Sequence, residues 1–316
     1  MRLVFISICF LFSSLTYSQK SYKDLIGDAD KFYRDKEYVK SVEVYKQAFK
    51  IEKKNGSNLY DAACSAALAG NKKMAFQWLN NAMDNGWINI HHMKQDKDLI
   101  SLHNQKKWNK LLSAMQKIVD VKEANYDKPL QAKLLEIYND DQPIRQEYIA
   151  ARKTYGHKSS QVDSLGKIML YKDSVNLIKV KHILDTHGWV GPDKVGNQAN
   201  QTLFLVIQHS DLKTQQQYLP MMREAVKNKN ASGSSLALLE DRVALGEGRK
   251  QIYGSQIGSD RETNKSYIFP LEDPDHVDER RAKVGLGPLA DYVKRWDIIW
   301  DVEAYKKEQM LKEKKE

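Results

Sequence analysis

The chain has 316 residues, of which 41% are hydrophobic and 29% are charged. These values exclude an intrinsically disordered chain and a mostly membrane-embedded one, and the length favours two domains. The formal net charge is +9, but the basic residues are spread along the chain without a basic–aromatic stripe, so we expect no nucleic-acid partner. Walker and His-Glu-x-x-His motifs are missing from the sequence, and we predict no cofactor and assign no metal.

The N-terminus has the pattern of a secretory signal peptide. Arg2 is followed by an apolar run over residues 3–15 and then by small residues before Gln19. The run is shorter than the ~20 residues that a membrane-spanning helix needs. We predict a signal peptide over residues 1–18 and a mature chain exported to the periplasm or the extracellular space, which does not span the membrane. An uncleaved anchor is the alternative.

A repeat of 34 residues follows. Shifting the sequence by this period aligns small or apolar residues: Leu25 with Leu59, Ala29 with Ala63, Ser41 with Ala75, Tyr45 with Leu79 and Ala48 with Ala82. Residues 22–55 and 56–88 therefore resemble two tetratricopeptide repeats, although the usual proline near the repeat end is missing. We expect residues 89–120 to cap them, which gives a repeat module over residues 19–120. The resemblance implies a concave groove that takes a protein or peptide partner.

The remaining residues, 121–316, predict a second helical domain. The apolar periodicity favours helices over 129–138, from a break at 140–143 to about 155, and over 160–186, 198–207, 236–245 and 277–284, with another around Tyr218. Residues 251–257 and 266–269 alternate like strands around a polar turn, which predicts a β-hairpin near 251–269. The predicted fold class is mainly all-α: tetratricopeptide hairpins followed by a helical domain with a small β-hairpin.

Polar side chains gather at the ends of these predicted elements, where residues often converge in clefts. The candidate catalytic residues are His187, His209, Asp211 and Asp241. Histidine can transfer protons near neutral pH, and Asp211 could orient an imidazole. The candidate ligand-binding residues are Arg242, Gln251, Tyr253 and Gln256, since Arg242 can hold a carboxylate or phosphate and the others can contact sugar or peptide groups. Each residue also has a structural reading, as a helix end, local turn, ion pair or strand residue. His187, His209 and Asp211 would suit zinc if they converged.

These residues also carry a second resemblance. The segments are His187-Gly188-Trp189, Gln208-His209-x-Asp211, Asp241-Arg242, Gln251-x-Tyr253-Gly254-x-Gln256, Pro270-Leu271-Glu272-Asp273 and Val277-Asp278-x-Arg280-Arg281. They look like the pattern of an uncharacterised bacterial domain family, over roughly residues 129–295. The resemblance implies domain boundaries and candidate positions but no reaction.

The sequence thus favours an exported tetratricopeptide-repeat protein that binds a protein or an envelope ligand, such as an anionic envelope polymer, through its groove and a polar pocket in the second domain. The alternative is a hydrolase or transferase that acts on an envelope polymer with His/Asp acid–base chemistry. Whether the protein is an enzyme stays open.

Overall fold

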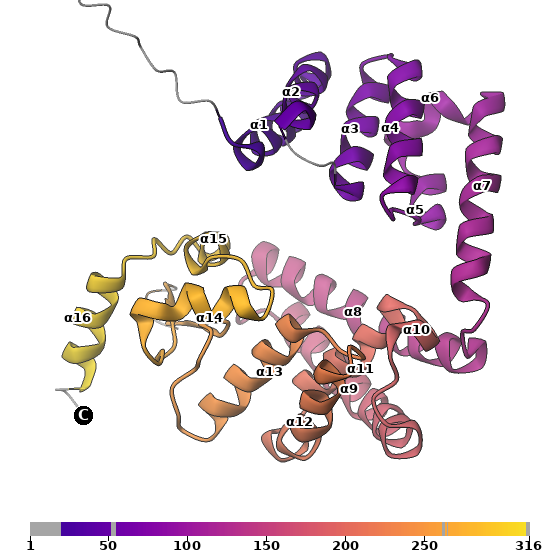
Figure 1. Ribbon diagram of the computed structural model, residues 1–316. Coiled ribbons are helices and arrows are strands. Elements are labelled where there is room, and N and C mark those ends of the chain that lie inside the picture. The colour runs from indigo at the N-terminus through magenta and orange to yellow at the C-terminus, as the bar shows by residue number, and fades with distance from the viewer. Residues whose placement is uncertain (1–19, 52–54, 261–262, 264, 314–316) are drawn as a thin grey trace, which may run out of the picture. The chain divides into compact units, whose positions relative to one another are not determined.

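The computed structural model describes residues 20–51, 55–260, 263 and 265–313, and the predicted signal peptide lies outside them. The chain divides between Lys122 and Glu123 into two compact units, called here the N-terminal unit and the C-terminal unit. Both are built from helices, and the sheet in the described part is one antiparallel pair of short strands, which confirms the predicted fold class (Figure 1). Among the described residues, none of the helices combines the length and apolar character needed to cross a membrane.

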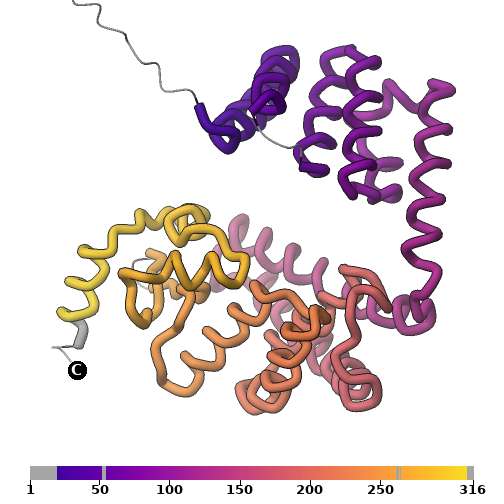
Figure 2. Tube along the Cα trace, in the orientation of Figure 1, coloured from indigo at the N-terminus to yellow at the C-terminus, as the bar shows by residue number. Residues whose placement is uncertain are grey.

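The N-terminal unit begins with two helical hairpins. The first consists of α1 (Tyr22–Arg34) and α2 (Tyr38–Ile51), and the second of α3 (Gly56–Leu68) and α4 (Lys72–Asp84). Ser21 caps α1 in a capping box with Asp24, and asparagine side chains cap α3 and α4. Helix α2 also packs on α3, so the hairpins stack on each other, as the chain trace in Figure 2 shows.

The aligned repeat positions form the core of this unit. All ten are buried: Leu25, Ala29, Ser41, Tyr45, Ala48, Leu59, Ala63, Ala75, Leu79 and Ala82. The small residues among them let helix backbones approach closely, and the Ser41 hydroxyl donates to the Ala29 carbonyl at 2.9 Å. The hairpins are therefore compatible with the predicted repeats.

Short helices follow the second hairpin: α5 (Ile90–Gln95), the 3-10 turn η1 (Lys97–Leu99) and α6 (Ile100–His103), before the longer α7 (Lys106–Glu123). Met93, Leu99 and Trp108 join the same core as the hairpins. The segment thus packs on the core of the hairpins through several short elements and the longer α7.

The C-terminal unit is built on two long antiparallel helices, α8 (Lys128–Tyr155) and α9 (Ser160–His187). The predicted break at 140–143 is wrong, because α8 continues through Pro143. Its inward face carries Leu130, Leu134, Ile137, Asp141 and Ile144 at helical spacing on both sides of the proline. This burial holds the helix together where local propensity alone would end it.

The other helices of this unit pack on the long pair. Helix α11 (Asn197–His209) contacts both α8 and α9, and α10 (Pro192–Val195) precedes it. Helices α12 (Leu212–Lys227) and α13 (Gly233–Gly246) pair with each other and also contact α11. Because His209 is the last residue of α11, this packing turns the polar end of a buried helix toward the long pair.

A small lobe closes the C-terminal unit. It contains β1 (Ile257–Ser259) and β2 (Ser266–Ile268), paired with Ile257 opposite Ile268, followed by η2 (Pro274–His276), α14 (Val277–Lys283), α15 (Leu289–Val293), η3 (Lys294–Trp296) and α16 (Val302–Glu313). The predicted first strand starts too early, because residues 251–256 form turns apart from one bridge between Gln251 and Leu271. The side-chain oxygens of Asp241 and Gln251 accept hydrogen bonds from the backbone of this segment and hold it in place.

Candidate functional site

The N-terminal unit contains an acidic pocket of about 650 Å³. Its carboxylates come from three parts of the chain: Asp30 on α1, Asp61 on α3, and Asp96 and Asp98 at η1. Tyr33, Tyr45, Tyr60, Cys64 and His92 also line it, together with the exposed Arg34, Gln95 and Lys97. Within the described residues, neither Arg34 nor Lys97 forms an ion pair with the four carboxylates. We call this feature the acidic pocket.

Tyrosine hydroxyls bind three of the four carboxylates. Tyr45 donates to Asp30 at 2.6 Å, Tyr60 donates to Asp96 at 2.6 Å, and Tyr33 donates to Asp98 at 2.5 Å. Burial together with these carboxylate partners raises the pKa of Tyr45 and Tyr60 well above its usual range. A neutral hydroxyl holds a carboxylate in position without cancelling its charge, so the pocket stays negatively charged.

Asp61 differs from the other three carboxylates. Its side chain is exposed, and no hydrogen bond or ion pair reaches its carboxyl from the described part of the chain. Burial and the charges of Asp30 and Asp96 raise the pKa of Asp61 to about 6, and the charge of His92 opposes this shift. An accessible carboxylate that lacks a counter-ion among other carboxylates favours a cationic ligand.

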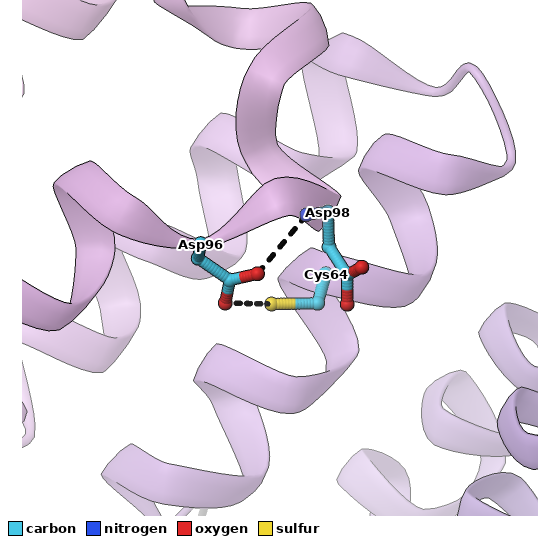
Figure 3. Close-up of side chains that lie close together, drawn as sticks. All are labelled: Cys64, Asp96 and Asp98. Atoms are coloured by element: carbon cyan, nitrogen blue, oxygen red, sulfur yellow. Dashed lines mark hydrogen bonds between the residues drawn. The ribbon is translucent and has the colours of Figure 1, made fainter.

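Cys64 is a buried residue that lines the acidic pocket, and Figure 3 shows its thiol beside the carboxylate of Asp96, with Asp98 nearby. Its buried thiol donates to Asp96 at 3.5 Å, and burial with the nearby carboxylates raises the pKa of the thiol. Ligand atoms of Cys64, Asp96 and Asp98 lie within 4.8 Å of one another, close enough for one metal ion. The protonated thiol and the tyrosine donors already satisfy these atoms, which is the arrangement of a pocket wall rather than of prepared metal ligands.

Asp241 in the C-terminal unit is fully buried on α13. Its carboxylate accepts hydrogen bonds from the backbone N–H groups of Ile252, Tyr253 and Ser255, at 2.6, 2.9 and 2.9 Å. Gly254 has a φ of +67°, which folds this loop tightly enough for the three N–H groups to converge. Burial raises the pKa of Asp241, and the three backbone donors oppose that shift. The carboxylate therefore fastens the loop to α13.

The predicted ligand-binding glutamines belong to the same loop. The buried Gln251 donates to the backbone carbonyls of Gln256 and Phe269, and its Oε1 accepts from the N–H of Gln256 at 2.9 Å. The Gln256 side chain donates to Ser255 Oγ at 3.0 Å. The Tyr253 hydroxyl lies 3.4 Å from Glu240. Asp241, Gln251, Tyr253 and Gln256 are thus brought together, with polar atoms directed at the loop and at α13.

His209 belongs to a different group. Its Nδ1 lies 3.3 Å from Asp141 Oδ1, on α8, and the same carboxylate accepts from Arg145 at 3.1 Å. Arg145 also pairs with Asp173 on α9. Burial raises the pKa of Asp141, but the hydrogen bonds and charges of His209 and Arg145 outweigh it and hold the pKa well below its usual range. We call Asp141, Arg145, Asp173 and His209 the His209 network.

Ligand atoms of Asp141, Asp173 and His209 also lie within 4.8 Å of one another, which fits a metal ion by distance. The guanidinium of Arg145, however, already pairs with both carboxylates. A divalent cation would have to displace it.

The other two catalytic candidates lie apart from these groups. His187 is exposed at the C-terminus of α9. Asp211 is exposed as the N-cap of α12, where it accepts from the Thr214 N–H at 2.7 Å. Asp141, not Asp211, contacts the His209 imidazole. The zinc set considered from the sequence, His187, His209 and Asp211, is not among the groups whose ligand atoms converge in the described part of the chain.

Sequence reasoning missed Asp141, Arg145 and Asp173. The Asp140–Pro143 segment reads as a chain break, which hides the i,i+4 spacing of Asp141 and Arg145 on one helix face. It also missed the acidic pocket, for which no local motif exists.

Comparison with known proteins supports the second resemblance. Residues 128–305 match the model of a family of unknown function, DUF6624, and this range contains the His209 network and the Asp241 loop. The N-terminal unit matches no tetratricopeptide family model. No curated protein and no solved structure matches the chain. Since the matched residues make up more than half of the chain, the protein belongs to the DUF6624 family, whose function is unknown.

Proposed function

We propose that the protein is an exported binding protein whose N-terminal unit is a pair of tetratricopeptide-like hairpins. In this proposal the acidic pocket takes a cationic side chain, lysine or arginine, from a protein or peptide partner. The observation that carries the proposal is the exposed Asp61 carboxylate, which lies near Asp30 and Asp96 and takes part in no hydrogen bond or ion pair within the described residues.

The chemistry of the walls favours a side chain over a metal ion. A pocket of about 650 Å³ is far larger than an ion needs. The ring of Tyr33, the least buried of the three tyrosines, can contact the apolar stem of a lysine or arginine while its charged end meets the carboxylates. The Tyr60 ring is itself held in place by stacking on Trp87, with ring centroids 3.7 Å apart. A preformed wall reduces the ordering cost of binding.

Two parts of the proposal rest on the sequence. Export rests on the N-terminal pattern, and the repeat assignment rests on the 34-residue period, with support from the burial of the aligned positions. Acid–base hydrolysis or group transfer on an envelope polymer stays a prediction.

Fluorescence anisotropy with two labelled peptides of equal length, one rich in lysine and one rich in glutamate, tests the proposal on the full chain. We expect saturable binding of the lysine peptide only. Asp61→Asn should weaken it about fivefold, since one charge contact in a partly solvated site contributes about 1 kcal/mol. Asp84→Asn is the matched control, because Asp84 is exposed at the end of α4 outside the pocket.

Equal binding of both peptides would contradict the proposal, as would equal effects of the two substitutions. Circular dichroism of each variant separates a binding effect from misfolding.

A further inference from the structure

Arg242 is a partly buried cation on α13. Its Nε is buried and has no hydrogen-bond partner, and within the described residues its guanidinium takes part in no ion pair. Burial lowers the pKa of Arg242, and the charge of Arg145 lowers it further, which puts the two guanidiniums within electrostatic reach of each other. A largely buried guanidinium is costly unless an anion accompanies it.

The carboxylates of the His209 network are already paired with another cation. Asp141 and Asp173 both pair with Arg145, and Asp141 also contacts His209. Neither carboxylate pairs with Arg242 in the described structure.

A second buried group beside the His209 network also lacks partners. Asn176 is 0% exposed, and neither its Nδ2 nor its Oδ1 has a hydrogen-bond partner in the described structure. It follows Asp173 by three residues and so lies on the same face of α9. The pairs Glu136–Lys179 and Arg145–Asp173 fix the register of the α8–α9 hairpin and set Asn176 at the level of Asp141.

Solvent can reach this region. The side chains of Arg145 and Asp173 are 18% exposed and that of His209 is 17% exposed, so each shows one edge to water. With Nδ1 directed at Asp141, the Nε2 of His209 has no partner among the described residues and is available to a ligand.

We propose that the C-terminal unit binds an anionic group, a carboxylate or a phosphate, which pairs with Arg242 next to the His209 network. Arg242 supplies a two-pronged donor, which planar carboxylates and phosphates both accept. His209 and Asn176 supply the remaining unpaired polar atoms of the region. This site is separate from the acidic pocket and takes a ligand of opposite charge, so the two proposals can fail independently.

Isothermal titration calorimetry of the full chain with inorganic phosphate and with acetate, at constant ionic strength, tests the proposal. We expect saturable binding of at least one anion at or below about 10 mM, a range typical of weak single-group ligands. Arg242→Met should weaken it at least about tenfold, because a charge-assisted contact is lost. Arg242→Lys should bind more tightly than Arg242→Met but less tightly than the unchanged chain, since lysine keeps the charge but lacks the two parallel N–H donors of the guanidinium.

Arg249→Met is the matched control and should bind as the unchanged chain does, because Arg249 is exposed and pairs with Glu247. Arg242→Met should not lower the unfolding midpoint, since within the described residues Arg242 makes no hydrogen bond that the substitution would remove. Binding of phosphate alone would identify a phosphate ligand, and binding of acetate alone a carboxylate. No saturable binding of either anion, or equal binding by Arg242→Met, would overturn the proposal.

Discussion

The two units satisfy their acidic side chains in different ways. In the acidic pocket, neutral tyrosine hydroxyls bind the carboxylates of Asp30, Asp96 and Asp98, and Asp61 has no partner in the described structure. In the C-terminal unit, Asp141 meets a guanidinium and an imidazole, and Asp241 meets three backbone N–H groups. The first arrangement keeps negative charge on a surface that solvent reaches. The second removes charge from water and uses it to hold elements together.

This difference explains why the same residue type has different expected effects in the two units. Substituting a buried and fully partnered aspartate leaves its donors unsatisfied and lowers stability. Substituting an accessible aspartate that lacks a partner removes repulsion and changes what the pocket binds. Stability and binding measurements on matched variants can therefore test the comparison directly.

The largest effect on stability is expected from Asp241→Ala. It would leave the N–H groups of Ile252, Tyr253 and Ser255 without their acceptor inside the protein. At about 1–3 kcal/mol for each unsatisfied group, with partial relief from water, we expect a loss of about 4 kcal/mol in the free energy of unfolding. Urea denaturation measures it.

The neighbouring Glu240→Ala is the control for that experiment. Glu240 pairs with the exposed Arg223 and accepts a long contact from the Tyr253 hydroxyl, but it holds no backbone N–H group, so its loss should cost about 1 kcal/mol, well below the loss expected for Asp241→Ala. If Asp241→Ala unfolds at the same urea concentration as the unchanged chain, Asp241 does not fasten the loop and its catalytic interpretation gains support.

Asp141→Asn should have the next largest effect. Asparagine keeps the shape of the side chain but removes the charge that faces Arg145 and His209, and the site is 1% exposed. Breaking a buried ion pair costs about 3–5 kcal/mol, and the second partner of Arg145, Asp173, should keep the loss near the lower figure.

Asp140→Asn makes the same chemical change one residue away. Asp140 pairs with Lys172, and both side chains are about a third exposed, so the expected cost is below about 1 kcal/mol. Equal costs for the two variants, measured by chemical denaturation, would mean that the His209 network does not stabilise the C-terminal unit.

Sequence patterns predicted these features unequally, for physical reasons. The buried repeat positions could be predicted because close helix packing needs small residues at fixed spacing, as at Ala29 and Ala63. The helical class followed from periodicity, and α9 ends within one residue of the predicted 186, where Gly188 takes a positive φ that ends a helix. The continuation of α8 through Pro143 could not be predicted, because tertiary burial decides it and local propensity does not.

The candidate sites were harder to predict than the helices. His209 and Arg242 could be singled out because charged groups within or at the end of apolar helices need partners. Their neighbours on α8 and α9, Asp141 and Asp173, lie 68 and 36 residues before His209, and only helix packing brings them to it. Asp61 is an ordinary helix residue in the sequence, and its chemistry arises from carboxylates on other elements.

The smallest predicted effect is a pH dependence of stability and binding that arises from Asp61 in the N-terminal unit. The folded protein holds the pKa of Asp61 at about 6, above the ordinary value of 3.8, so between these pH values the folded state binds more protons than the unfolded state. The contribution of Asp61 to stability therefore falls as pH rises from about 4 to about 6, and because the side chain is exposed, screening should keep the change below about 1 kcal/mol. Asp61→Asn should remove this slope and be as stable as the unchanged chain, or slightly more stable, at neutral pH.

Affinity for the lysine peptide should rise over the same pH interval in the unchanged chain, because the pocket gains a negative charge, and should stay flatter in Asp61→Asn. Anisotropy titrations at several pH values, with Asp84→Asn as control, measure this. The same pH dependence in both variants would place the titrating group outside the acidic pocket.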